Sequence, residues 1–248
     1  SSKKIFAPSL NTKRDIERVL GVAGEKVIVT PEGVDEVFER AQTITKSRAQ
    51  TLIEKKFNIP SPFILYVGVW SEHKNLERLV EAYEELCSTS RTPGSSGTLN
   101  HRLVIAGTPN PQYPHIMRRI ERSAYRAEIL TPGFIPEGDL PTLYRAAAVF
   151  TFVSLYEGFG LPVLEAQAAG TPVVASNTTS IPEVGGKALV AVDPMDTHAI
   201  ARGIQQLLGD QDLYQATIQA GIKNAQRFKW EATARATYMI YQALLGEV

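Results

Sequence analysis

The sequence predicts an α/β protein with a doubly wound, Rossmann-like parallel sheet and helices at its C-terminal end. Short β-branched runs alternate with longer helical patterns along the chain, and most of these runs are continuously apolar. Continuous apolar runs are typical of strands that are buried on both faces of a parallel sheet. Because parallel strands are joined by right-handed crossovers through helices, this alternation favours a doubly wound sheet.

The order of the elements follows from the same patterns. After a strand-like start, a helix is predicted over Thr12–Leu20, capped by Thr12 and stopped by Gly21. The predicted strands are Val27–Thr30, Phe63–Gly68, Arg102–Gly107, Ala148–Val153, Pro172–Ala175 and Ala188–Val192. The later helices are Asn75–Leu86 with Asn75 as N-cap, Leu140–Ala147 with Asp139 as cap, one that starts at Leu161-Pro162, and two or three between Thr197 and Leu245.

The composition excludes several classes of protein. With 26 Lys+Arg and 26 Asp+Glu among 248 residues, the formal net charge is zero, which argues against a nucleic-acid binder held by a broad basic field. Cys87 is the single cysteine, so an internal disulfide and a cysteine-based zinc site are excluded, and a reducing compartment is favoured. No run approaches the roughly 18–20 apolar residues of a membrane-spanning helix. The four histidines lack the paired spacing of a metal site.

Two segments stand apart from the α/β pattern. Residues 88–100 are rich in Ser, Gly and Thr and are predicted to form a flexible surface insertion. Residues 1–8 contain neither a starting Met nor the apolar stretch of a signal peptide. This start is interpreted as the junction with a preceding domain.

The loop after Ala148–Val153 has the pattern of a ligand site. Ligands of open parallel sheets bind beyond the carboxyl ends of the strands, and here the chain reads Glu157-Gly158-Phe159-Gly160-Leu161, with Glu165 one turn into the helix. The glycines let the backbone approach a ligand, and the amides of the helix start would face a negative or hydroxyl-rich group. Two carboxylates beside such a turn suit a sugar or a ribose. Alternatively, each carboxylate only interacts with the helix dipole, which is worth about 0.3–1 kcal/mol.

Two other loops add weaker indications. Lys74 follows Phe63–Gly68 and would put a cation beside the positive end of the next helix, which a bound anion would offset. A solvated lysine is the alternative for this segment alone, but together with the glycine turn a phosphate is favoured. In the loop Thr131–Leu140, Phe134 either stacks on a base or fills the core. Asn177 and Ser180, after the fifth strand, are interpreted as helix caps only.

These residues carry a resemblance to a known family. The run Glu157–Ala166, followed by Ala169–Ser176, resembles the donor-site signature of retaining glycosyltransferases with the GT-B fold, a large group that includes α-mannosyltransferases, glucosyltransferases and sucrose synthases. The similarity extends from residue 5 to residue 210. Segments that agree in order and spacing are Thr12–Ile16, Val29–Asp35, Leu65–Gly68, Lys74–Leu76, Leu103–Gly107 and Ile181–Val184.

The resemblance implies roles for the matching residues. Glu157 would face the donor sugar and Glu165 would hold the ribose hydroxyls, while Lys74 would neutralise the diphosphate. Many family members have an arginine where this chain has Val69, so His73 or a group from another domain would have to replace it. The other implied contacts are Gly68, Gly158, Phe159, Gly160 and Leu161 to the sugar and phosphates, and Phe134 and Ile135 to the nucleobase.

The resemblance also implies what surrounds the chain. Residues 1–248 match only the donor-binding half of a two-domain enzyme, so an acceptor-binding domain would precede Ser1, and the helix at 229–248 would cross back to it. The expected reaction moves mannose or glucose from a nucleoside diphosphate sugar to a hydroxyl acceptor, with GDP-mannose favoured and UDP-sugars left open. No cofactor or metal is implied, since the aspartate cluster of metal-dependent transferases is absent.

Three further expectations complete this interpretation. A cytoplasmic location is implied, with contact to the inner face of the cytoplasmic membrane only through the other domain. The isolated chain is expected to be inactive or nearly so. The alternatives are a stand-alone nucleotide-sugar-binding module that needs a partner for catalysis, and a sugar-nucleotide epimerase of the same fold, which the Glu157–Glu165 motif disfavours.

Overall fold

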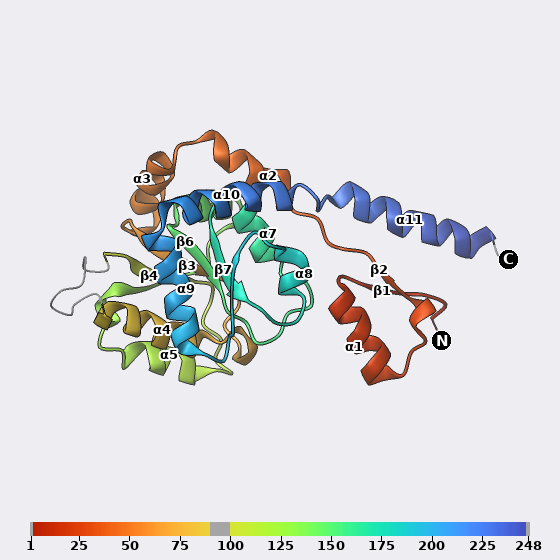
Figure 1. The fold of residues 1–248 in the computed structure, drawn as a ribbon, viewed down its shortest axis with the longest axis horizontal. Helices are drawn as coiled ribbons and strands as arrows, with labels where there is room; N and C mark the ends of the chain where they lie inside the picture. Colours follow the sequence, from red (N-terminus) through yellow and green to blue (C-terminus); the bar gives the residue numbers. More distant parts are fainter. Residues whose placement is uncertain (1, 90–99, 247–248) are drawn as a thin grey trace.

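The computed structural model describes residues 2–89 and 100–246, in which a large parallel sheet is covered by helices on both faces (Figure 1). The expected insertion at 88–100 therefore falls mostly outside the described residues. The strands are β1 (Ile5–Ala7), β2 (Val27–Val29), β3 (Phe63–Val67), β4 (Arg102–Ala106), β5 (Ile129–Gly133), β6 (Val149–Phe152), β7 (Val173–Ser176) and β8 (Val190–Val192). The helices are α1 (Leu10–Leu20), α2 (Glu36–Arg40), α3 (Lys46–Phe57), α4 (Leu76–Thr89), α5 (Pro114–Glu121), α6 (Leu140–Ala146), α7 (Leu161–Ala168), α8 (Ile181–Gly185), α9 (Thr197–Gly209), α10 (Gln211–Ala225) and α11 (Trp230–Gly246).

The large sheet has six parallel strands in the order β5-β4-β3-β6-β7-β8. The chain moves outward from β3 to β5 and then returns to the other side of β3 with β6. The predicted doubly wound α/β fold is thus confirmed. In such sheets the crevice at the carboxyl ends, where the order reverses, is the place where ligands bind. Here that crevice lies between the loops that follow β3 and β6.

The core explains why these strands could be predicted. All four residues of β6 and all four of β7 are buried, as are the first four residues of β3. Aromatic rings connect the strands to the helices: Tyr66 stacks on Phe152, Phe152 on Phe150, and Phe150 meets Tyr144 of α6 edge-on at 5.1 Å. Strands buried on both faces need continuous apolar sequences, which is the pattern that the chain has.

One strand was missing from the sequence-based prediction. Residues from Thr131 onward were predicted as a loop because of Pro132 and Gly133, but β5 continues through both of them. Among the described residues, β5 is an edge strand that pairs only with β4. A proline can be accommodated there because one side of an edge strand needs no ladder hydrogen bond.

Of the predicted helix caps, two were wrong and a third has the predicted position without the capping hydrogen bond. Ser9, not Thr12, is the N-cap of α1, and its hydroxyl accepts from the Thr12 amide, whereas the predicted stop at Gly21 is confirmed by its left-handed φ of 63°. Asp139 is the N-cap residue of α6, but its side chain makes no capping hydrogen bond and instead forms an ion pair with Lys56. Asn75 ends a short 3-10 turn with a φ of 59°, and its side chain is used for contacts described below.

The first residues and the last helix form a smaller unit beside the large sheet. β1 and β2 pair with each other in parallel, so the predicted strand at Val27–Thr30 does not join the large sheet. α11 lies along this unit, where Tyr241 meets the ring of Phe6 edge-on at 5.9 Å. Tyr238, Met239 and Leu245 of α11 are exposed.

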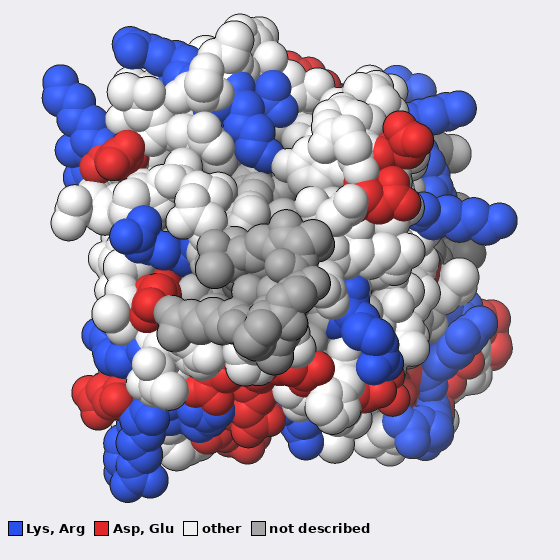
Figure 2. Space-filling view, turned by 60° about the vertical axis from the view of Figure 1, so that its left-hand side comes forward, with Lys and Arg blue, Asp and Glu red and all other residues white. Residues whose placement is uncertain are grey.

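Lysine, arginine and acidic side chains are interspersed on the face of the molecule shown in Figure 2.

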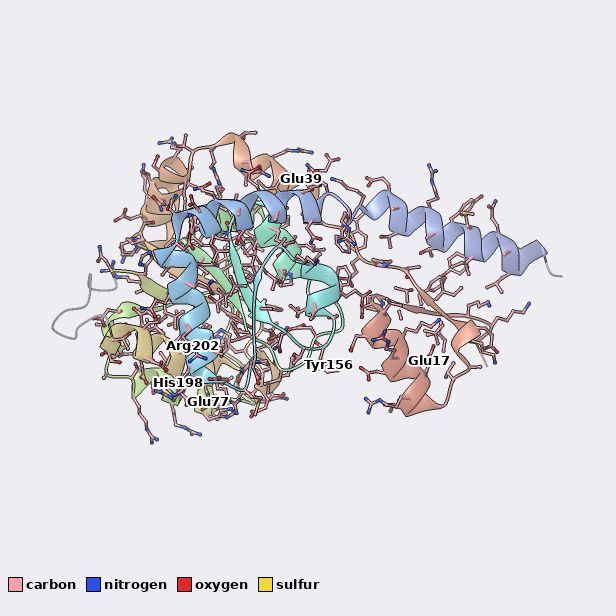
Figure 3. All side chains as sticks on the ribbon, in the orientation of Figure 1. Glu17, Glu39, Glu77, Tyr156, His198 and Arg202 are labelled. Carbon is pink, nitrogen blue, oxygen red and sulfur yellow. The ribbon has the colours of Figure 1, made fainter. Side chains whose placement is uncertain are left out.

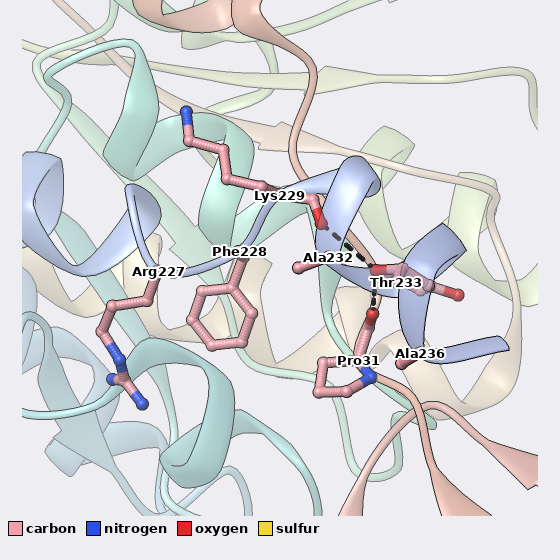
Figure 4. A pocket seen from close by; sticks show the side chains of 8 residues that line it. Pro31, Arg227, Phe228, Lys229, Ala232, Thr233 and Ala236 are labelled. Carbon is pink, nitrogen blue, oxygen red and sulfur yellow. Dashed lines mark hydrogen bonds between the residues drawn. The ribbon is translucent and has the colours of Figure 1, made fainter. Parts of the chain in front are cut away.

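Two chain segments cross between the smaller unit and the large sheet. Lys229 pairs with Glu39 of α2, the labelled residue beside the start of α11 in Figure 3. Thr233 donates to the carbonyl oxygen of Pro31 in the other segment, beside a cavity of about 350 Å³ (Figure 4). Gly33 packs so closely on α11 that a Cβ there would lie 2.2 Å from the amide nitrogen of Trp230. The two crossings are therefore packed against each other.

A buried amide network fixes α7 against its neighbours. Gln167, which is 1% exposed, donates from Nε2 to the carbonyl oxygens of Gly185 and Ala188 at 3.1 and 3.0 Å. Its Oε1 accepts from Asn224 of α10 at 2.8 Å. Asn224 also donates to the carbonyl oxygen of Val184. The network joins α7, α8 and α10 behind the crevice.

We expect Gln167→Leu to lower the free energy of unfolding by about 2–4 kcal/mol, because two buried carbonyl oxygens and one buried amide each lose a hydrogen bond. Urea unfolding followed by circular dichroism measures the change. Gln205→Leu is the matched control, because Gln205 is exposed on α9, and there we expect a change within about 0.5 kcal/mol. Equal effects of the two substitutions would contradict this account.

Candidate functional site

The loops after β3 and β6 are joined to each other at the crevice. The amide of Leu155 donates to the carbonyl oxygen of His73 at 2.7 Å. Asn75 is buried, and its Nδ2 donates to the carbonyl oxygens of Val153 and Pro194 at 2.9 and 2.7 Å. The side chain that was predicted to cap a helix therefore connects the β3 loop to the ends of β6 and β8. These contacts fix the backbone on both sides of the crevice.

Lys74 and Glu157, 83 residues apart in the sequence, form an ion pair in this crevice. Their Nζ and Oε1 atoms are 2.6 Å apart, and the side chains are only 15% and 12% exposed. Lys74 also lies over the ring of Phe152 at 5.1 Å. The cation that was expected to hold an external anion is thus neutralised by a carboxylate of the chain. An anion that entered here would exchange with Glu157 and free that carboxylate to accept from hydroxyl groups.

The glycine turn between β6 and α7 is held from three directions by hydroxyl groups. Ser180 Oγ lies 2.9 and 2.7 Å from the carbonyl oxygens of Glu157 and Phe159. The amide of Glu157 donates to Thr179 Oγ1, and Ser9 and Thr12 both donate to the carbonyl oxygen of Gly158. The turn is thus held in place through its own backbone groups, without use of the start of α7.

The start of α7 has no side-chain cap. Gly160 precedes it with a φ of 108°, a conformation that favours glycine, and a Cβ at this position would displace the end of the Ile181 side chain, whose Cδ1 would lie 2.5 Å away. The first amides of a helix have no acceptor within the helix. Pro162 has no N–H, and the amide of Val163 donates to the carbonyl oxygen of Gly160. Because α7 also begins without a capping hydroxyl or carboxylate, the amide of Leu161 is suited to a negatively charged ligand.

The smaller unit contacts the turn through α1. The carboxylate of Glu183 in α8 accepts from the amide of Leu10 at 3.0 Å. Tyr156, labelled on the side facing α1 in Figure 3, donates to Asp15 at 2.7 Å. Arg18, and secondly Tyr156, hold the pKa of Asp15 below its ordinary value. These contacts bring α1 against the site loop.

An apolar cavity of about 270 Å³ opens at the carboxyl ends of β3, β4 and β5. Phe134 lies at this cavity with 69% of its surface exposed, whereas Ile135 is buried. Phe134 therefore does not fill the core, which was the commoner alternative. The remaining lining residues are Val67, Gly68, Val69, Ala106, Gly107, Thr108 and Leu140. A cavity with apolar walls and backbone edges suits a planar heterocyclic ring.

Glu165 is partly buried on the first turns of α7. The hydroxyl of Tyr144, which is fully buried, donates to Glu165 Oε2 at 2.8 Å. Burial raises the pKa of Glu165 above its ordinary value, the Tyr144 hydrogen bond opposes this shift, and the charge of Glu137 adds to it. The hydrogen bond from Tyr144 therefore fixes the orientation of the Glu165 carboxylate through Oε2 and leaves Oε1 outside this contact.

The predicted site residues thus fall into two groups. Lys74, Glu157 and the glycine turn come together in the crevice, and Gly68, Val69, Phe134 and Ile135 line the apolar cavity. His73 is exposed, and in the described part of the chain its side chain contacts Ser71 rather than the ion pair. Val69 is 64% exposed. Sequence reasoning missed the supporting residues Ser9, Thr12, Tyr144, Thr179 and Ser180, because a hydroxyl that contacts a distant loop leaves no local pattern.

Together these features favour a ligand with three parts. The cationic Lys74 and the start of α7 suit a phosphate, the Glu157 carboxylate suits hydroxyl groups, and the cavity suits a planar ring. A ligand with all three is a nucleotide that carries a sugar.

In the described residues, no helix has the length and apolar character needed to cross a membrane.

Comparisons with known proteins agree with the expected family. The sequence model described as "Glycosyl transferases group 1" matches residues 47–224. An O-antigen chain mannosyltransferase B of Escherichia coli is 32% identical over 98% of this chain and 61% of its own length. A D-inositol 3-phosphate glycosyltransferase of Xylanimonas cellulosilytica is 31% identical over 97% of this chain and 57% of its own length. The chain thus spans about three fifths of such relatives.

Solved structures show the same fold. A sucrose-phosphate synthase of Thermosynechococcus elongatus superposes with a TM-score of 0.83 at 25% identity, over all of this chain and 60% of its own. The Anabaena protein HepE, solved in complex with UDP and glucose, superposes with a TM-score of 0.82 at 18% identity, over 98% of this chain and 64% of its own.

The raised pKa of Glu165 predicts how its substitution changes stability with pH. The folded state binds the proton of the Glu165 carboxyl group more tightly than the unfolded state does. The stability that this protonation contributes is therefore complete below the ordinary pKa of 4.5 and is lost as pH rises through the pKa of the folded state. Glu165→Gln has no such loss. We therefore expect the free energy of unfolding of Glu165→Gln, relative to that of the unmodified chain, to increase above pH 4.5 and then level off. Urea unfolding between pH 4 and 8 measures this difference.

Tyr144→Phe provides the control for this measurement. It removes the hydrogen bond that opposes the shift, so the loss of stability should extend to higher pH. A difference between Glu165→Gln and the unmodified chain that did not vary with pH would contradict the assignment.

Proposed function

The chain belongs to the group 1 glycosyl transferases, and from this we propose that it is the donor-binding half of a retaining hexosyltransferase. Such an enzyme moves a mannosyl or glucosyl group from a nucleoside diphosphate sugar to a hydroxyl acceptor. The observation that carries the proposal is the Lys74–Glu157 ion pair, beside an uncapped helix start and an apolar cavity.

In this proposal the diphosphate replaces Glu157 as the partner of Lys74. When the bond between the anomeric carbon and the phosphate oxygen breaks, negative charge builds up on the departing nucleoside diphosphate. The Lys74 ammonium and the amides from Gly158 to Leu161 would stabilise that charge, and these groups are held in place before the reaction. The released Glu157 carboxylate would orient the sugar through its hydroxyl groups.

The nucleoside would extend from the crevice toward the apolar cavity. The base would lie against Phe134 and the backbone of Ile135, and Glu165 would accept from the ribose hydroxyls. GDP-mannose is the donor we favour, and the likeness to a curated mannosyltransferase supports this choice. UDP-sugars remain the second candidate, because backbone contacts to a base discriminate weakly.

We propose that the acceptor binds to a further domain of the whole protein, in the part that corresponds to the unmatched two fifths of the relatives. We propose that this domain sits against α1 and the exposed face of α11, and that the protein acts in the cytoplasm. Since the chain spans about three fifths of its relatives, both statements concern the whole protein.

Calorimetric titration of the chain with GDP, UDP and ADP tests the donor site. We expect one nucleotide to bind saturably, and Lys74→Met to weaken it about tenfold to hundredfold, because a contact between a charged donor and a phosphate is worth about 1.5–3 kcal/mol. Glu165→Ala should also weaken binding. Lys223→Met, which removes an exposed lysine of α10, is the control of equal charge and should bind like the unmodified chain.

A titration in which no nucleotide bound, or in which Lys74→Met bound as tightly as the control, would contradict this donor site.

A second test concerns turnover. We expect the 248-residue chain alone to release hardly any nucleoside diphosphate from its donor in the presence of a hydroxyl acceptor, since the proposal places the acceptor site in another domain. A coupled assay of nucleoside diphosphate release measures this rate. Transfer at about 1 s⁻¹ or faster, within the ordinary range of enzymes, would show that the chain holds both sites and would contradict the proposal.

A further inference from the structure

A third cavity lies at the opposite end of the strands of the large sheet from the donor site. It has a volume of about 330 Å³ and lies among α3, α6 and α10. Residues just before β6 and β7 show that this is the amino-terminal end of the strands. Tyr214 of α10 donates to the carbonyl oxygen of Ala148, and Gly170 lines the cavity. In Figure 1, α3 and α10 lie above the strands. The site is thus separate from the crevice at the carboxyl ends.

Two cations face this cavity without a carboxylate. Lys46, the first residue of α3, and Arg145 of α6 line it together with the amides of Gln42, Gln215 and Gln219. No acidic residue is among the lining residues, and neither cation forms an ion pair in the described part of the chain. Several other cations do have carboxylate partners, namely Lys13, Lys56, Lys74, Arg119 and Lys229.

The neutral partners of these cations use only part of their donors. Lys46 donates to the hydroxyl of Tyr214, which leaves two of its three protons. Arg145 donates from Nε to the carbonyl oxygen of Ile44 at 3.3 Å and from Nη1 to that of Gly170 at 3.4 Å, both long contacts. Its guanidinium has five donors in all. Both side chains are therefore fixed in position and retain donors for a further acceptor.

The electrostatic surroundings make an anion favourable at this point. Burial, followed by the charge of Arg145, lowers the pKa of Lys46 to about 8. Lys46 also stands at the positive end of the α3 dipole, which disfavours a cation. The pKa of His101, before β4, is lowered by burial and then by Lys46, so this neighbour adds no compensating charge. An anion would offset all of these repulsions at once.

We propose that this cavity is a binding site for a small dianion of the phosphate class, inorganic phosphate or a phosphate monoester, held by Lys46 and Arg145. The cavity is large enough for a phosphate with a short organic group, and the glutamine amides of α10 lie at its rim as further donors. The ligand would connect α3, α6 and α10, so its binding stabilises the folded chain by mass action.

Calorimetric titration with inorganic phosphate, using the whole 248-residue chain, tests this site. We expect saturable binding that Lys46→Met weakens at least tenfold, since one contact to a charged donor is lost. Arg48→Met is the matched control: Arg48 lies on the same helix, is exposed and does not line the cavity, so its variant should bind like the unmodified chain. Glycerol phosphate in a parallel titration distinguishes the ligand sources, because tighter binding would identify a monoester and equal binding the free ion.

A second variant keeps the test valid if Lys46→Met folds poorly. Gln219→Glu places a carboxylate at the rim of the cavity from an exposed position of α10. We expect this variant to lose phosphate binding and to melt at a higher temperature than the unmodified chain without phosphate, since it supplies the missing counter-charge.

The donor crevice is the competing location for phosphate, and Lys74→Met separates the two. Phosphate binding that Lys74→Met abolishes, while Lys46→Met and Gln219→Glu retain it, would overturn the proposal. An absence of saturable binding at millimolar phosphate, or equal binding by all variants, would overturn it as well. Because this cavity lies at the opposite end of the strands from the crevice, failure of the phosphate-site proposal would leave the proposed donor site unaffected.

Discussion

The ion pair between Lys74 and Glu157 is the interaction on which the candidate site depends. It forms where the strand order of the sheet reverses, so each partner comes from a loop on a different side of the crevice. A partly buried cation and a partly buried carboxylate would each be costly alone, whereas together they keep both loops near the crevice. The other contacts there, from Asn75 and from the amide of Leu155, hold the two backbones at the spacing that this pair requires.

The hydroxyl groups around the glycine turn follow from the same requirement. A turn that offers its amides to a ligand cannot satisfy its carbonyl oxygens through those amides, so other parts of the chain must do so. Ser180, just before α8, and Thr12 of α1 supply hydroxyl donors to carbonyl oxygens of the turn. The start of α7 is thereby left without a cap while its surroundings stay ordered. The uncapped helix start and the bonded carbonyl oxygens are two aspects of one arrangement.

Much of the fold could be predicted from the sequence because buried parallel strands need continuous apolar runs. The glycine turn was visible for a similar reason, since a φ of 108° at Gly160 restricts the residue type. β5 was missed because its Pro132 is tolerated only at a sheet edge, and edge position depends on the whole topology. The cap at Asn75 was wrong because its side chain bonds to Val153 and Pro194, far away in the sequence. The partner of Lys74 could not be predicted from local spacing either.

The donor crevice and the cavity at Lys46 and Arg145 differ in one respect that bears on selectivity. At the crevice, a simple phosphate that took Lys74 would leave Glu157 without its cation, and an unpaired carboxylate in a partly buried place is unfavourable. A sugar nucleotide avoids this cost because its hydroxyl groups satisfy Glu157 while its phosphates satisfy Lys74. The built-in carboxylate therefore discriminates against small anions at the donor site. At the amino-terminal ends of the strands, Lys46 and Arg145 have no such carboxylate within residues 2–89 and 100–246, and a small phosphate meets no comparable penalty there. The same electrostatic rule thus favours a sugar nucleotide at the carboxyl ends of the strands and a small anion at their amino-terminal ends.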